Sequence, residues 1–264
     1  MHPMFPSAAI VAFLSVAAGV GATSGCGKPA EFISKFVPLG PSNVFSPLDF
    51  MVGVLGKSSQ ALCTGVLIGP QIVAISATCI HKRLDQQPFK ASIGGLNIGE
   101  QDGEEGYSCY GAPDIALLFL SSKSSAQPIP ILPDHKWMEI LSDAEVDLEI
   151  FGWFSTDQKE FECLGKAHTK SMSWGNCENT ITRKDVAKAS GLRCSEAPDT
   201  ALWFWDVGAP LIYSMDGKKY LVGLWSYEDG RCGRNSNMRP ESIVYTPLPP
   251  LRAWIEFAPV DGTG

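Results

Sequence analysis

Histidine is scarce in this 264-residue sequence, which contains four. Past residue 22 there are three histidines, His81, His135 and His168, and histidine is the side chain best suited to act as a general base near neutral pH. The same part holds eight cysteines, an even number, without the paired C-x-x-C spacing of a zinc site. The pattern favours a disulfide framework over a metal centre, and we expect no cofactor. The cysteines are Cys26, Cys63, Cys79, Cys109, Cys163, Cys177, Cys194 and Cys232.

The N-terminal stretch 1–22 has the features of a secretory signal peptide. An uncharged apolar run extends from Ala8 to Val20, and Val20 and Ala22 fit the small-residue rule for cleavage, while the run is too short to span a bilayer. We therefore predict a signal peptide at 1–22, an N-terminal extension at 23–35 and a secreted, extracellular protein with oxidised cysteines. The net charge of −7 argues against nucleic acid or an anionic membrane surface as a partner.

Beyond the N-terminal stretch, the sequence consists of short apolar runs separated by Gly, Pro, Asn and Asp. Such runs predict β-strands, and their number predicts an all-β fold that would hold the candidate residues in place. Two helices are expected, a clear one at Pro250–Phe257 and a second possible one at Thr182–Ser190, and the segment from Ser121 to Leu132 is expected to link two halves of the chain. The expected strands are Phe50–Leu55, Ala61–Ile68, Ile72–Ile75, Ile115–Leu120, Val146–Phe151, Leu211–Tyr213 and Tyr220–Trp225.

Five segments, in order, resemble the trypsin-like (S1) serine proteases. CTGVLIGPQIVAISATC at 63–79 is similar to the family's CGGSLI…WVLTAAHC, DIALLFL at 114–120 to DIALLKL, and FGW at 151–153 to its GWG turn. WDVGAPL at 205–211 falls where the family has GDSGGPL, and LVGLWS at 221–226 is similar to the strand that lines the substrate cleft. The resemblance runs from about Phe36 to Phe257. It implies a homology domain at 36–258 made of two antiparallel β-barrels, about 36–125 and 133–250, and a short C-terminal helix.

The resemblance places the catalytic triad at Thr78, Asp114 and Val207. In the family these positions hold the histidine base, the aspartate that orients it and the serine nucleophile. Thr78 cannot take up a proton near pH 7, and Val207 has no atom with which to attack a carbonyl. Trp205 also replaces a glycine of the oxyanion hole. The resemblance therefore implies a pseudo-protease that cannot cleave peptide bonds by the family's mechanism.

Two substitutes for the missing groups can be considered. His81 follows Thr78 by three residues, so a helical turn could bring it to the same face, but a surface histidine beside a disulfide is the favoured interpretation. Asp206 and Asp114 could act as an acid pair, but their family positions have different surroundings. In active relatives the counterpart of Asp206 pairs with a new N-terminus, and whether this chain is cut after Lys35 stays open.

The resemblance also marks a possible binding surface. Trp203, Phe204 and Trp205 stand beside the serine position, and Tyr227 and Glu228 replace a Trp-Gly pair that edges the substrate pocket. These aromatic side chains either fill space that a substrate once needed or form an interface, since Trp and Tyr dominate interface energetics. Space filling is slightly favoured, and both interpretations stay open.

By the same resemblance, Cys63–Cys79 and Cys177–Cys194 are expected disulfides. The other four cysteines, Cys26, Cys109, Cys163 and Cys232, allow three pairings, among them Cys163–Cys232 with Cys26–Cys109.

The function implied is that of a secreted, proteolytically inactive homologue that binds another protein, as an inhibitor or decoy of an extracellular hydrolase. Inactive homologues of this kind include the glucanase inhibitor proteins of plant-infecting oomycetes, which bind host endoglucanases. The expected partner is thus an extracellular protein such as a host glycosidase or protease. Two alternatives remain, an active secreted hydrolase with an unrecognised site and a structural extracellular protein.

Overall fold

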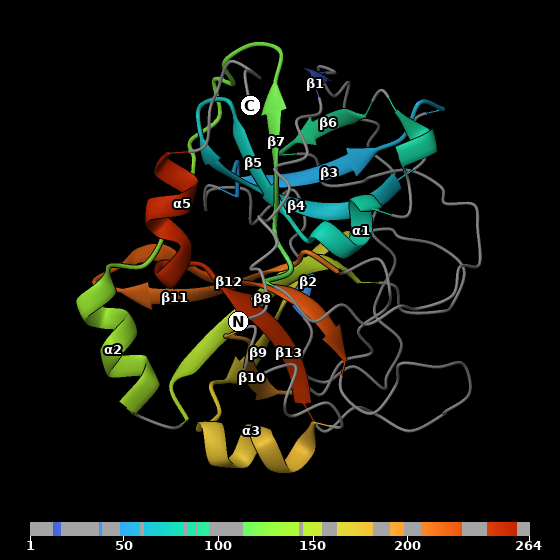
Figure 1. Cartoon of the computed structure of the whole chain (residues 1–264). Coiled ribbons are helices and arrows are strands. Elements are labelled where there is room, and N and C mark those ends of the chain that lie inside the picture. The colour runs from blue at the N-terminus through green and yellow to red at the C-terminus, as the bar shows by residue number, and fades with distance from the viewer. Residues whose placement is uncertain are drawn as a thin grey trace, which may run out of the picture.

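Two β-sheets packed on each other make up most of the molecule (Figure 1). The computed structural model describes the backbone at 13–16 and 37–38, and the chain at 48–58, 61–81, 84–87, 89–94, 113–142, 145–154, 163–181, 191–197, 207–228 and 242–257. Of Trp153, Phe154, Cys163, Tyr227 and Glu228 it describes the backbone only.

The first sheet closes into a barrel in the order β1-β6-β3-β4-β5-β7. All its pairings are antiparallel except those of β1, which is parallel to both of its neighbours. β1 lies inside the stretch predicted to be a signal peptide. The strands are β1 (Phe13–Val16), β3 (Met51–Leu55), β4 (Ala61–Gly69), β5 (Ile72–Ile75), β6 (Lys90–Ile93) and β7 (Ala116–Leu120).

The second sheet has seven antiparallel strands in the order β10-β13-β12-β11-β8-β9-β2. The two curled sheets confirm the predicted all-β, trypsin-like fold. The strands are β2 (Val37–Pro38), β8 (Asp147–Phe154), β9 (Cys163–Lys170), β10 (Arg193–Glu196), β11 (Pro210–Met215), β12 (Lys218–Glu228) and β13 (Ser242–Pro247).

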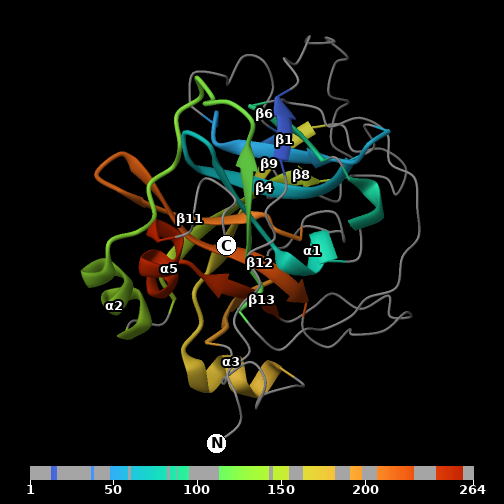
Figure 2. The same ribbon diagram turned by 45° about the horizontal axis from the view of Figure 1, so that its top comes forward.

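Short helices decorate the two sheets, and α5 supplies the expected C-terminal helix. α5 and α2 lie on one side of the molecule and α3 lies against the second sheet (Figures 1 and 2). None of the helices in the described ranges is long and apolar enough to cross a membrane. The possible helix at Thr182–Ser190 falls outside the described residues. The helices are α1 (Ala77–His81), η2 (Leu84–Gln86), α2 (Asp134–Ser142), α3 (Trp174–Thr180), η4 (Pro249–Leu251) and α5 (Arg252–Glu256).

One continuous apolar core joins the two sheets. Its buried members come from both, and the ring of Phe50 meets the ring of Phe151 edge to face, with centroids 6.3 Å apart. The segment 121–132 passes from one sheet to the other. Ile129 donates a backbone hydrogen bond to Leu67 in the first sheet, and Leu132 donates one to Leu221 in the second.

An ion cluster lies on the second sheet. The carboxylate of Glu149 on β8 accepts hydrogen bonds from the ammonium groups of Lys166 on β9 and Lys219 on β12, the latter at 2.7 Å. The Lys219 ammonium also lies 5.1 Å from the centre of the Phe151 ring. Partial burial would raise the pKa of Glu149, but the two lysines outweigh it and hold the pKa below its ordinary value.

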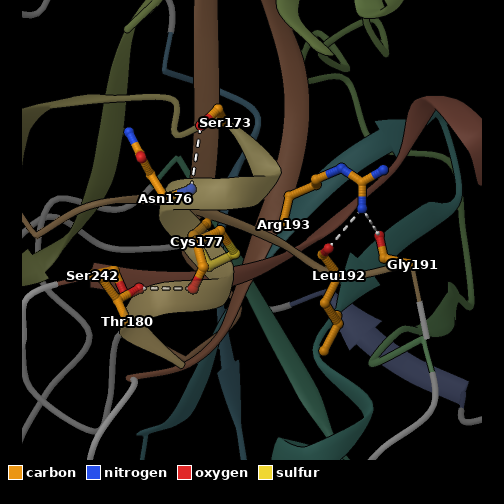
Figure 3. The surroundings of a disulfide bond; sticks show 9 residues. Ser173, Asn176, Cys177, Thr180, Gly191, Leu192, Arg193 and Ser242 are labelled. Atoms are coloured by element: carbon orange, nitrogen blue, oxygen red, sulfur yellow. Dashed lines mark hydrogen bonds between the residues drawn. A yellow bond between two sulfur atoms is a disulfide. The ribbon is translucent and has the colours of Figure 1, made fainter. Parts of the chain in front are cut away.

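A small satellite core surrounds the Cys177–Cys194 disulfide, which joins α3 to β10 (Figure 3). Ser173 caps α3 by accepting a hydrogen bond from the amide of Asn176 at 3.3 Å. At the other end of α3, the hydroxyl of Thr180 bonds the carbonyl of Cys177 at 3.0 Å and lies 2.9 Å from the hydroxyl of Ser242 (Figure 3). α3 is therefore held by a covalent bond and by side chains rather than by a broad apolar face.

Candidate functional site

Asp114 is the centre of the candidate site. It directly precedes the apolar run that becomes β7, and only 3% of its surface is exposed, so its carboxylate needs hydrogen-bond donors. Three donors meet it. The hydroxyls of Ser76 and Ser226 each lie 2.6 Å from Oδ2, and the amide of Thr78 lies 2.7 Å from Oδ1. These are the short lengths of hydrogen bonds to a charged acceptor.

The donors come from different parts of the fold. Ser76 and Thr78 belong to the turn from β5 into α1, and Oδ1 caps α1 by accepting from the Thr78 amide, one of the groups a helix start leaves unpaired. Ser226 belongs to β12 in the second sheet. On β13, the hydroxyl of Thr246 bonds the backbone of Asp114, accepting from its amide at 3.2 Å. Asp114 therefore ties the first barrel to the second sheet.

Both acceptor directions of Oδ2 are used by serine hydroxyls. A carboxylate offers about four lone-pair positions over its two oxygens, and the Ser76 and Ser226 hydroxyls take two of them on the same oxygen. The resemblance would have an imidazole donate to this carboxylate. With Ser76 and Ser226 in place, the remaining acceptor capacity is on Oδ1, which already holds the backbone amide of Thr78.

Val207 lies in the turn that precedes β11 and is part of the core, with 8% of its surface exposed. The next residue, Gly208, has φ of +91°, a conformation that favours glycine, and its amide donates to the carbonyl of Trp225 at 2.8 Å. A side chain on Gly208 would collide with the carbonyl of Thr64 on β4. This backbone is thus held tightly between the sheets, at the position that the resemblance assigns to the serine.

The three histidines are exposed, unlike the hydrogen-bonded group around Asp114. His81 is the last residue of α1, as the spacing from Thr78 suggested, but it is exposed, as are His135 at the start of α2 and His168 on β9. Asp114, in contrast, is buried. In the described part of the chain, no group of three His, Cys, Asp or Glu side chains could hold a metal ion.

Several predicted residues lie outside the described part of the chain. Trp203, Phe204, Trp205 and Asp206 are among them, so the aromatic surface and the acid-pair hypothesis stay predictions. The backbones of Tyr227 and Glu228 extend β12 and pair with Val244 and Ile243 on β13. Lys35 and the cysteines at 26, 109 and 232 lie outside it as well, and for Cys163 only the backbone is described.

The structure confirms the two disulfides that the resemblance implied. Cys63–Cys79 joins β4 to α1, next to Thr78, and Cys177–Cys194 joins α3 to β10. The residues that sequence reasoning missed are the partners of Asp114, namely Ser76, Ser226 and Thr246. The sequence predicted them only indirectly: a buried aspartate requires nearby hydrogen-bond donors, but its position does not indicate which residues supply them.

These observations define a two-sheet β protein whose halves meet at a buried aspartate, and the comparisons with known proteins agree. The Trypsin family model matches residues 42–255, and the chain belongs to this family. Among solved structures, the secreted serine protease VesC from Vibrio cholerae is similar, with a TM-score of 0.59 and 16% sequence identity over 80% of this chain. At that identity the likeness concerns the fold, and the matched region spans 46% of VesC, about half its length. The search of curated proteins gives no match.

Proposed function

We propose that this chain is a secreted, proteolytically inactive member of the trypsin family that acts by binding an extracellular protein. In the narrower form of the proposal it is an inhibitor or decoy of a host hydrolase, such as an endoglucanase. The family places chemistry at Thr78, Asp114 and Val207, and two of these residues lack the atoms that the chemistry requires.

The observation that carries the proposal is the set of hydrogen bonds around Asp114. Its carboxylate is engaged by Ser76, Ser226 and the Thr78 amide, all within 2.7 Å. The two serine hydroxyls near it are almost fully buried and donate to it, so neither is oriented as a nucleophile toward a substrate. This arrangement supports a structural role for the aspartate and a scaffold that does no acyl transfer.

The disulfides and the apolar core support the proposal of protein binding. Both expected disulfides and the two-sheet core are present, so the loops around the triad positions are held on a rigid frame. The aromatic residues at 203–205 and 227 are of the types that dominate binding energetics. A rigid frame with aromatic loops suits a binding protein.

The chemical half of the proposal is tested by active-site labelling. The secreted chain is incubated with a serine-directed fluorophosphonate and with a generic peptide mixture, alongside an active trypsin-family protease as positive control. We expect neither labelling nor cleavage. Labelling of any serine, or defined peptide products that survive addition of unrelated protease inhibitors, would favour the active hydrolase instead.

The binding half is tested by affinity capture from extracellular fluid, with identification of retained proteins by mass spectrometry. The matched control is the variant Trp203→Ser/Trp205→Ser/Tyr227→Ser, checked for an unchanged melting temperature. We expect a hydrolase retained by the parent chain and lost with the variant. Retention of no glycosidase or protease would contradict the inhibitor proposal, and equal retention by both proteins would move the interface away from the aromatic residues.

A further inference from the structure

Residues 129–132, which we call the strap, carry the chain from the first sheet to the second. The amide of Ile129 donates to the carbonyl of Leu67 on β4 at 3.0 Å, and the amide of Leu132 donates to the carbonyl of Leu221 on β12 at 2.9 Å. In both views the chain that leaves β7 runs past α5 before it enters α2 (Figures 1 and 2). A C-terminal element therefore lies beside the segment that bonds both sheets.

The carbonyl groups of the strap depend on donors from elsewhere in the fold, because prolines at 130 and 133 contribute no N–H group. The carbonyl of Pro130 accepts from the amide of Leu221 on β12, and the carbonyl of Pro133 accepts from the amide of Trp137 on α2, each at 2.9 Å. These two bonds attach the strap to the second sheet and to α2.

Arg252, the first residue of α5, supplies the donors for the two carbonyls between these prolines. Its Nη2 lies 3.3 Å from the carbonyl oxygen of Ile131 and 2.7 Å from that of Leu132, and its Nε lies 3.3 Å from Oδ1 of Asp134 at the start of α2. Leu132 is completely buried, so the loss of a donor at its carbonyl would be costly. One guanidinium thus joins α5, the strap and α2.

We propose that Arg252 acts as a latch: docking of α5 holds the strap closed, and the strap, α2 and α5 open together while the strands of both sheets stay paired. α2 and α5 are short helices, which depend on packing for their stability. When α5 leaves, the carbonyls of Ile131 and Leu132 lose their donor in the same step. Cooperative opening of such a unit, below the free energy of global unfolding, is a common property of folded domains. The latch requires neither a partner protein nor the loss of proteolytic activity.

The test is native-state hydrogen exchange of the full chain with its disulfides intact, measured amide by amide by NMR. The amides of Leu132 and Leu221 report on the strap, that of Trp137 on α2 and that of Phe257 on α5. The amide of Trp225, which bonds within the second sheet, is the internal reference for the strands that stay paired.

Three variants separate the contributions of the side chain. Arg252→Met removes every bond of the guanidinium, whereas the matched control Asp134→Asn removes only the ion pair and keeps the bonds to the strap. Arg252→Lys keeps the charge without the planar fork that spans two carbonyls.

We expect Arg252→Met to accelerate exchange at the strap, α2 and α5 reporters by a common factor of roughly tenfold or more, the effect of losing a hydrogen bond to a charged group. The reference amide of Trp225 should exchange as in the parent. Asp134→Asn should resemble the parent protein, and Arg252→Lys should fall between the parent and Arg252→Met.

Unchanged exchange at the strap in Arg252→Met would overturn the proposal, and so would an equal acceleration at Trp225, because the molecule would then open as a whole. An effect of Asp134→Asn as large as that of Arg252→Met would assign the coupling to the ion pair and overturn the role of the carbonyl bonds. If Arg252→Met does not fold, the parent protein in low concentrations of urea decides the question. One shared opening free energy for the reporters, below that of Trp225, supports the latch, and separate values or a value equal to that of Trp225 overturn it.

Discussion

Replacing Asp114 by asparagine isolates the structural contribution of its charge, because the side chain keeps its shape. The carboxylate accepts three hydrogen bonds, from two serine hydroxyls at 2.6 Å and an amide at 2.7 Å. A hydrogen bond to a charged group contributes about 1.5–3 kcal/mol, and a neutral one about 0.5–1.5 kcal/mol. Each of the three hydrogen bonds should therefore lose about 1 kcal/mol when its acceptor becomes neutral. The neutral side chain also no longer pays the cost of burying a charge, so the expected fall in the free energy of unfolding is about 2–3 kcal/mol.

Asp114→Ala goes further, because it leaves the three donors without their acceptor inside the fold. We expect it to lower the free energy of unfolding by about 3–5 kcal/mol, the range for removing one partner of a buried charged interaction. Since Asp114 joins the first barrel to β12 and β13, the loss should weaken contact between the two halves rather than one strand. Ser76→Ala, which removes a single donor, should cost less than either change.

The assay is urea-induced unfolding at pH 7 with the disulfides intact, followed by tryptophan fluorescence. Asp134→Asn is the matched control, because that aspartate is 74% exposed and its contact with Arg252, at 3.3 Å, contributes at most about 1 kcal/mol. An Asp114→Asn protein as stable as the Asp134→Asn control would refute the reasoning. It would mean that the aspartate, like many catalytic groups, is neutral or costly for stability.

Three further changes test other parts of the structure. Glu149→Gln should lower the free energy of unfolding at pH 7. Because the pKa of Glu149 in the folded state is lowered from 4.5, the difference in stability between variant and parent should disappear as the pH falls through that lowered value. Urea unfolding measured at a series of acidic pH values would show it. Cys177→Ser/Cys194→Ser should lower stability by about 3 kcal/mol, since it opens a loop of 17 residues, and hydrogen exchange should localise the effect to α3 and β10. An imidazole introduced by Thr78→His should titrate near its ordinary pKa by NMR, whereas the added change Ser76→Ala should raise that pKa, because it frees the carboxylate for a hydrogen bond.

The sequence predicted the fold best where strands are buried on both faces. The runs at 61–68, 72–75 and 115–120 are continuous and apolar, and the structure has strands there within one residue at either end. It missed β9, in which Lys166, His168 and Lys170 alternate with buried residues, because that sheet face is turned to solvent. The short strands β6 and β10 carry too few apolar residues to stand out.

Short helices such as α3 were harder to predict, because they depend on contacts with distant parts of the chain. α3 has a weak apolar pattern, WGNCENT, and it depends on the disulfide to β10 and the cap at Ser173. These are tertiary contacts that local sequence does not encode, since short helices are stabilised mainly by packing. α5 was predictable because a proline start and recurring apolar residues coincide there.

At the candidate site, the resemblance predicted the three triad positions but did not predict which residues surround the carboxylate of Asp114. These residues are Ser76, Ser226 and Thr246, which are separated from it by 38, 112 and 132 positions and meet it only through the fold. The sequence alone does not distinguish these three residues from the other serines and threonines, because both residue types are common and most of them are exposed. The need for donors follows from the chemistry, and their identity follows from the topology.

If the histidine position of the family is Thr78, as the resemblance implies, the hydroxyl of Ser76 supplies a donor that Asp114 would otherwise lack. A buried carboxylate that loses a histidine partner keeps its desolvation cost but loses a donor, and this would destabilise the joint between the two sheets. Ser76, two positions before Thr78 on the same turn, donates to Oδ2 at 2.6 Å and supplies that donor from within the first barrel. A serine placed there also competes with any imidazole for the same oxygen. The bond from Ser76 therefore contributes to the stability of the joint between the two sheets, which is the structural role that the proposed function gives to Asp114.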